Sequence, residues 1–200
     1  SGTQGIGKSI SIVKDAVSAW LDGSVVFTNF KTYIPGTNKS FSYVMNLHEI
    51  IETLKDNQER ILKARKQVFV GVMEAWKISR YYQDIRKQDY YAELFNQLRK
   101  YNADASFDSP RSMDMPPGMR DNVNKIFLPC KVHDDRSICR EPKCRLHHMI
   151  EVREVVAKNR GIPNFILVDR FDSSNYGKFY NSFKNEIIEE PELDFDADDE

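Results

Sequence analysis

The chain has 200 residues, of which 40% are hydrophobic and 30% are charged. This length and composition describe a soluble globular protein with one domain and a sizeable core. No apolar run approaches the length that spans a membrane, and no secretory signal is visible. We therefore expect an intracellular protein without a membrane span.

The formal net charge of −1 hides an asymmetry along the chain. Residues 186–200 hold nine acidic residues and no basic one, whereas residues 1–185 hold 29 basic and 21 acidic residues. A body with a net charge of +8 fits a polyanionic partner such as DNA, although lysines and arginines also serve as plain solvated surface. The acidic segment 189–200 is expected to be a flexible tail.

The chain opens with a G-x-x-x-x-G-K-[ST] string, the sequence of a phosphate-binding loop. Its glycines let backbone N–H groups turn toward phosphate oxygens, Lys8 would reach the β- and γ-phosphates, and Ser9 would ligate Mg²⁺. The alternative is a flexible glycine-rich terminus. The expected nucleotide-binding residues are Gly2, Thr3, Gln4, Gly5, Ile6, Gly7, Lys8 and Ser9.

A helix is expected directly after this string, at residues 8–22. Its apolar residues recur at steps of three and four, and Gly23 is a natural stop. The positive end of such a helix would point at the bound anion. Because a phosphate-binding loop normally follows a hydrophobic strand and nothing precedes Ser1, we expect that the sequence begins inside a longer protein.

Strands and helices are expected to alternate along the chain. Such alternation predicts parallel strands in a sheet covered by helices. A polar, proline-rich segment at 108–124 predicts a loop near the carboxyl end of a strand, where α/β proteins form ligand sites. The expected strands are 24–30, 67–73, 103–107, 125–132 and 164–170, and the expected helices are 8–22, 46–65, 77–101, 146–160 and 175–188.

The apolar strand expected at 67–73 ends in a carboxylate, Glu74. In P-loop enzymes a glutamate at this place can orient and deprotonate the attacking water. The alternative is that Glu74 caps the next helix.

The later motifs follow a recognisable order. Thr28-Asn29 ends the second strand, Arg99-Lys100 ends a helix before the strand 103–107, and Ser109-Pro110-Arg111-Ser112 and Arg120-Asp121-Asn122 follow. With the phosphate-binding loop and Glu74, this order resembles the FtsK/HerA superfamily of DNA-pumping ATPases. Within that superfamily the chain is most similar to viral genome-packaging ATPases.

The resemblance implies a RecA-like, three-layer α/β P-loop NTPase domain over residues 1–188, with a mainly parallel central sheet. It implies that Glu74 is the catalytic base and that Arg99 reaches into a neighbouring subunit as an arginine finger. Asp108 falls near the polar sensor of the family, and Arg120 is a second finger candidate. Met73 stands where the family has an aspartate that helps to hold Mg²⁺, which leaves Ser9 and Glu74 as the expected metal-site residues.

The function implied by the resemblance is genome packaging. The chain would form a homo-oligomeric ring and use Mg²⁺-dependent ATP hydrolysis to move double-stranded DNA into a preformed capsid. Its place would be the cytoplasm of an infected host cell, at the procapsid, with capsid or portal-vertex proteins as partners. Two alternatives stay open: a small-molecule or nucleotide kinase, and a nucleotide-binding assembly protein without turnover.

Three cysteines and several histidines lie within or next to a basic insertion at about 131–147. Cys139, Cys144, His147 and His148, with His133 and Cys130 nearby, are metal-ligand types, but their spacing does not match a standard zinc motif. Zinc, a disulfide and free thiols all remain open. If the insertion lines a ring pore, its basic residues could follow DNA phosphates without reading the sequence.

Overall fold

The structure, a computed structural model, describes residues 7–75, 77, 95–110, 123–141, 144, 146–159, 162–181 and 187–188. Arg120, the acidic segment 189–200 and the first part of the phosphate-binding string, residues 1–6, lie outside the described residues. Most of the helix expected at 77–101 and of the loop expected at 108–124 lies outside them as well.

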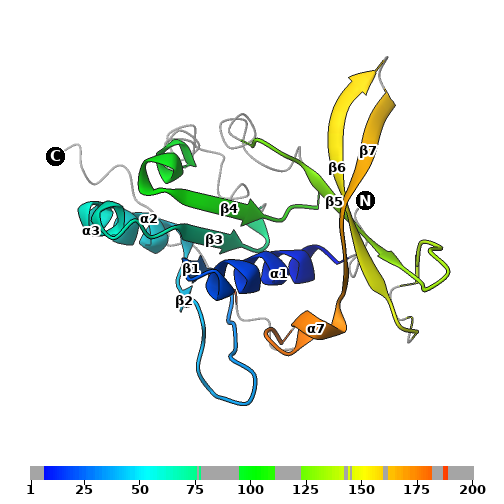
Figure 1. Cartoon of the computed structure of the whole chain (residues 1–200), viewed down its shortest axis with the longest axis horizontal. Coiled ribbons are helices and arrows are strands. Elements are labelled where there is room, and N and C mark those ends of the chain that lie inside the picture. The colour runs from blue at the N-terminus through cyan, green and yellow to red at the C-terminus, as the bar shows by residue number, and fades with distance from the viewer. Residues whose placement is uncertain are drawn as a thin grey trace.

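Four strands form a parallel sheet with the order β2-β1-β3-β4 (Figure 1). They are β1 (Val25–Thr28), β2 (Tyr43–Val44), β3 (Val68–Val72) and β4 (Ala103–Phe107). All five residues of β3 are buried, as an apolar run in the middle of a covered parallel sheet should be. The expectation of an α/β fold with a parallel sheet is confirmed for this part of the chain.

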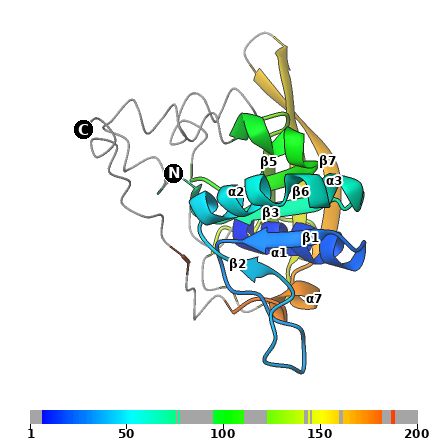
Figure 2. The same cartoon turned by 90° about the vertical axis from the view of Figure 1, so that its left-hand side faces the viewer.

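Helices pack on both faces of this sheet (Figure 2). Val68, Val70 and Val72 of β3 pack with the apolar side of α2 (Leu47–Asp56). The alternate residues of β3, Phe69 and Gly71, face α1 (Lys8–Leu21) on the other side of the sheet. At Gly71 a Cβ would come within 3.2 Å of Ile12 Cγ2. The period of two along β3 therefore supplies a core on each side of the sheet.

The helix expected at 46–65 exists but is divided. It begins with a capping box in which Asn46 and Glu49 each accept a hydrogen bond from the backbone N–H of the other. At Asn57 the backbone leaves the helical region, and the side-chain amide of Asn57 donates to Thr53 O at 2.9 Å. A second helix, α3 (Gln58–Lys63), then leads to β3.

The helix expected at 146–160 is wrong, because this segment is a strand. Three strands, β5 (Phe127–Val132), β6 (Met149–Asn159) and β7 (Ile162–Asp172), form a separate antiparallel sheet with β6 in the middle. Ile150 and Val152 are buried together with Phe171 of β7. The β-branched residues of β6 favour a strand, and hydrogen bonding to β5 on one side and β7 on the other stabilises the strand over a helix.

The helix expected at 175–188 is also wrong in its extent. Only α7 (Ser174–Gly177) is helical among the described residues of that range. The chain then places Tyr180 in the core cluster on the α1 face, and Ile187 makes an antiparallel bridge with Phe30 beyond the end of β1. No helix in the described part of the chain is long and apolar enough to cross a membrane.

The antiparallel sheet is attached to the parallel one through α1. Lys14 of α1 forms an ion pair with Asp169 of β7 and lies 5.6 Å from the centre of the Phe171 ring. Ile10 of α1 packs against the apolar cluster of β6 and β7 that contains Ile150.

Candidate active site

Four of the predicted site residues, Lys8, Ser9, Glu74 and Asp108, meet where the parallel strands end. In Figure 1 the arrows of β3 and β4 point toward the end of α1 that begins at Lys8. Asp108 directly follows β4, and Glu74 lies two residues beyond the end of β3. This edge of a parallel sheet, with a helix beginning beside it, is the usual place for ligand sites in α/β proteins.

Gly7 caps α1 in a conformation that favours glycine, with φ of 98° and ψ of 6°. A Cβ at this position would also lie 2.8 Å from Ile150 Cδ1, so the Ile150 side chain would have to shift to admit it. No side chain caps the helix, and its first turn contains no acidic residue. The backbone N–H groups of this turn are therefore oriented for an anion.

Lys8 and Ser9 both contact the segment that follows β4. Lys8 Nζ donates to Ser109 O at 3.3 Å, and the Ser9 hydroxyl lies near enough to the Asp108 carboxylate to affect its pKa. Burial raises the pKa of Asp108, and the nearby charge of Glu74 adds to this effect. Hydrogen bonds from Glu74 N–H and Ser9, together with the charge of Lys8, act in the opposite direction without cancelling it.

The backbone conformation and main-chain hydrogen bonds of Glu74 fix its position. Its φ of 54° lies in the left-handed region, which is uncommon for a residue with a side chain. The N–H of Glu74 donates to Asp108 Oδ1, and the N–H of Ala75 donates to Asp108 O at 3.0 Å. The side chain forms a 2.5 Å ion pair with Lys77. Glu74 and Asp108 are thus fixed against each other by main-chain contacts.

Met73 faces away from this edge, which explains the difference from the expected aspartate. Its side chain is 1% exposed and belongs to the apolar cluster on the α1 face, with Ile12, Val13 and Phe30. A carboxylate here would be buried among apolar groups. Position 73 is therefore part of the core and not of the candidate site.

Tyr180 is buried beside this edge, in the same apolar cluster as Met73, a position that the sequence did not predict. Burial raises its pKa to about 12, with the charges of Asp108 and Glu74 adding to the effect. Its ring packs edge-to-face on Phe30 at 5.6 Å between centroids. The local sequence does not predict that Tyr180 packs on the α1 face, because it predicts a helix at 175–188 that the structure does not have around Tyr180.

Arg99 is not brought to the same edge. It lies in η1 (Arg99–Tyr101), which precedes β4, whereas Asp108 follows β4. The five residues of the strand separate the two ends by about 16 Å. Nothing is described of the Arg99 side chain, and residues 2–6 and Arg120 lie outside the described residues. The structure thus brings together Lys8, Ser9, Glu74 and Asp108, but not Arg99.

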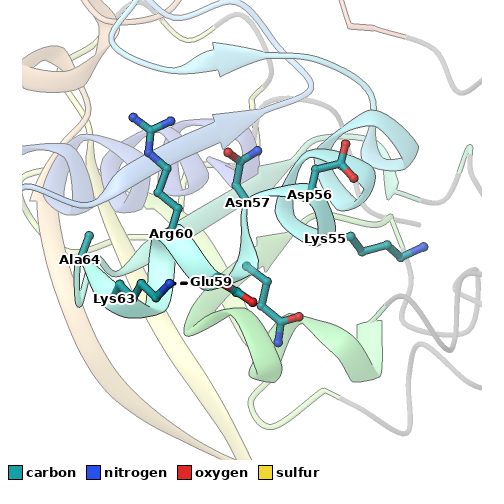
Figure 3. A pocket seen from close by; sticks show the side chains of 8 residues that line it. Lys55, Asp56, Asn57, Glu59, Arg60, Lys63 and Ala64 are labelled. Atoms are coloured by element: carbon teal, nitrogen blue, oxygen red, sulfur yellow. Dashed lines mark hydrogen bonds and ion pairs between the residues drawn. The ribbon is translucent and has the colours of Figure 1, made fainter.

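The pocket drawn in Figure 3 lies elsewhere, at the junction of α2 and α3. Because α3 leads into the amino end of β3, this pocket is at the opposite edge of the sheet from Glu74. Its lining is charged and solvated, as in the exposed 3.1 Å ion pair of Lys63 with Glu59. No predicted site residue lines it.

Among the cysteines and histidines of the insertion, four come together: His133, Cys139, Cys144 and His148. All three cysteines are free thiols, so the disulfide alternative is not realised. Cys130 and His147, which the sequence also suggested, are outside this cluster.

Comparisons of the chain with protein-family models, with curated proteins and with solved structures gave no match.

Proposed function

We propose that the chain is a RecA-like P-loop NTPase that binds and hydrolyses ATP at the carboxyl edge of its parallel sheet. The observation that supports this most is the meeting of Lys8 and Ser9, at the start of α1, with Asp108 and Glu74 at the ends of two adjacent strands. The uncapped first turn of α1 and the glycine conformation at Gly7 fit a phosphate group.

In the proposed mechanism each residue has one task. Lys8 and the N–H groups of the first turn bind the phosphates, and Glu74 accepts the proton of the attacking water. When Mg²⁺ is bound, it neutralises charge on the phosphate oxygens. Catalysis then depends mainly on the fixed positions of these groups.

Asp108 is proposed to hold the cation together with Ser9. The Ser9 hydroxyl lies near enough to lower the pKa of Asp108, and Asp108 is the carboxylate beside the serine that the loop motif assigns to Mg²⁺. Met73 cannot take this role, because its side chain points into the core. In this proposal the missing aspartate of the third strand is replaced by one from the fourth strand.

The resemblance to viral FtsK/HerA ATPases supports a wider proposal. The chain would act in the cytoplasm of an infected cell, as a ring that drives double-stranded DNA into a procapsid. The +8 charge of residues 1–185 fits DNA phosphates. Arg99, which precedes the strand that Asp108 follows, would complete the site of a neighbouring subunit.

ATP hydrolysis with and without duplex DNA tests the proposal. We expect phosphate release that depends on Mg²⁺, loss of ATP binding in Lys8→Ala, and normal turnover in Lys63→Ala, an exposed lysine on α3. Hydrolysis only with a small-molecule acceptor would identify a kinase instead. ATP binding without any turnover would identify an assembly protein.

A further inference from the structure

The segment between β5 and β6 folds back on itself as a short hairpin. Val132 and Ile138 form an antiparallel bridge, and His133 N–H donates to Ser137 O at 2.9 Å. The turn needs Arg136 in the left-handed region, with φ of 67°. Cys139 N–H then donates to Lys131 O at 2.8 Å. The hairpin therefore places His133 and Cys139, six positions apart in the sequence, next to each other.

Two further residues complete a cluster of two thiols and two imidazoles. Cys144 comes from the loop after the hairpin, and His148 directly precedes β6. One ligand atom from each of the four residues lies within 4.8 Å of every other. Zinc bonds of about 2.0 Å to nitrogen and 2.3 Å to sulfur place tetrahedral ligands about 3.3–3.8 Å apart, so an inward shift of about 1 Å would suffice.

The two histidines each keep a buried nitrogen without a hydrogen-bond partner. These atoms are Nδ1 of His133 and Nε2 of His148, and His148 is only 6% exposed. The two rings lie 4.7 Å apart between centroids. A buried polar atom without a partner costs about 1–3 kcal/mol, and a bound cation would remove this cost.

The neighbouring candidates are excluded by their own contacts. Both ring nitrogens of His147 are used, with Nδ1 at 3.0 Å from Asp134 and Nε2 at 3.0 Å from Asp172. Cys130 lies on β5 opposite Glu151 of β6 and is not part of the cluster. These two residues provide matched controls of the same chemical types.

We propose that His133, Cys139, Cys144 and His148 bind one structural zinc ion. Two sulfur and two nitrogen ligands form a closed tetrahedral set, which leaves no open position for a substrate. On binding, each thiol loses its proton to solvent, and the two thiolates balance the charge of Zn²⁺. The proposal does not depend on the proposed ATPase activity.

The zinc ion would provide the core that this segment lacks. Its described apolar side chains Ile138 and Leu146 are 50% and 68% exposed, whereas Cys139 and His148 are buried. The ion would join the hairpin to the start of β6 and so fix the basic residues of the insertion, such as Arg136 and Arg140, in one arrangement. A site of this kind stabilises a small segment because metal binding is coupled to its folding.

Metal analysis of the full chain, purified without chelator under reducing conditions, tests the site. We expect about one zinc ion per chain by inductively coupled plasma mass spectrometry. The cobalt-substituted protein should show the visible absorption bands of a tetrahedral site with thiolate ligands. Cys139→Ser and His148→Asn should lose the metal, while Cys130→Ser and His147→Gln keep it. No zinc in the wild type after reconstitution, or loss only in the two control variants, would overturn the proposal.

A measurement on the wild-type chain keeps the test valid if the variants do not fold. Zinc should protect Cys139 and Cys144 from alkylation while Cys130 reacts, and a chelator should abolish this difference. Trypsin should cleave after Arg136 and Arg140 only in the chelated protein. Alkylation or cleavage that does not respond to the chelator, or a disulfide between Cys139 and Cys144 in the reduced preparation, would contradict the zinc site.

Discussion

The side-chain amide of Asn29 pairs with the backbone of Met73 in both directions. Its Nδ2 donates to Met73 O at 2.9 Å, and its Oδ1 accepts from Met73 N–H at 2.8 Å. The paired residues of β1 and β3 end at Thr28 and Gly71, so the Asn29 side chain extends this contact beyond the strands. Asn29 therefore fixes the backbone immediately before Glu74.

Replacing Asn29 by alanine should destabilise the fold and reduce hydrolysis. The change leaves the buried N–H and C=O of Met73 without partners, which costs about 1–3 kcal/mol for each group. Urea unfolding should show a lower free energy of unfolding in Asn29→Ala and no change in Asn38→Ala, an exposed asparagine. Equal stability of the two variants would show that the amide pair is not needed.

Met73→Asp should not create a better magnesium site. The side chain lies in the apolar cluster of α1, so the new carboxylate would be buried without a partner at a cost of several kcal/mol. Met73→Leu keeps the volume and should cost less than about 1.5 kcal/mol. Thermal unfolding compares the two variants. A stable Met73→Asp protein with tighter Mg²⁺ binding would contradict the assignment of Asp108.

Asp108→Asn should raise the Mg²⁺ concentration that gives half-maximal ATP hydrolysis. Asparagine keeps an oxygen for Glu74 N–H but loses the negative charge, and we expect a shift of about tenfold or more. Asp104→Asn is the control, because Asp104 lies on the same strand and is bonded to Gln67 at 2.7 Å. A Mg²⁺ dependence that Asp108→Asn leaves unchanged would remove Asp108 from the cation site.

Arg99→Ala should leave ATP binding intact and reduce turnover by about 10³–10⁵-fold, the range for a missing arginine finger. Glu74→Gln should also bind ATP without hydrolysing it. If Arg99 acts on a neighbouring subunit, a mixture of the two inactive variants should recover part of the activity, because some interfaces combine a normal Glu74 with a normal Arg99. Inactivity of the mixture would place Arg99 outside the shared site.

Because of the ion pair of Lys14 with Asp169, the stability of the fold should depend on pH in the alkaline range. Burial lowers the pKa of Lys14, but the hydrogen bond with Asp169 and the charges of Asp15 and Asp169 outweigh this effect, so the pKa lies above the usual 10.5. A lysine with a raised pKa stabilises the fold below pH 10.5, and this contribution is lost as the pH rises through the higher folded value.

We therefore expect Asp169→Asn to lower the free energy of unfolding by up to about 1 kcal/mol at pH 7–9. The difference from the wild type should shrink above pH 10.5. Glu59→Gln, which breaks the exposed pair with Lys63, should have almost no effect at either pH. A difference for Asp169→Asn that grows at high pH would have the wrong sign for this pair.

Elements with a strong local pattern could be predicted from the sequence. The apolar period of α1, the capping box at Asn46 and the apolar run of β3 all lie within a few residues and do not depend on distant partners. The segment of β6 could not be predicted in this way. Its apolar residues fit both a helix and a strand, and the choice depends on pairing with β5 and β7.

The same distinction holds for the sites. Gly7, Lys8, Ser9 and Glu74 belong to short motifs, so their chemistry is visible in the sequence. Tyr180 reaches the apolar cluster beside Met73 only through the path of the chain after β7. For the zinc site the residue types were evident, but the spacing matched no standard motif because a hairpin turn, rather than a short loop, brings His133 to Cys139.

Ile150 occupies the space that a side chain at Gly7 would need. Strand β6, which begins beside the cysteine and histidine cluster, thus lies against the residue that caps α1. Thermodynamic linkage makes such a contact work in both directions. In the proposed ATPase, a partner that shifts the long β6–β7 hairpin would change the affinity for nucleotide by the same factor as nucleotide changes the affinity for the partner. In the proposed ATPase, Ile150 would therefore couple the position of β6 to the phosphate site at the start of α1.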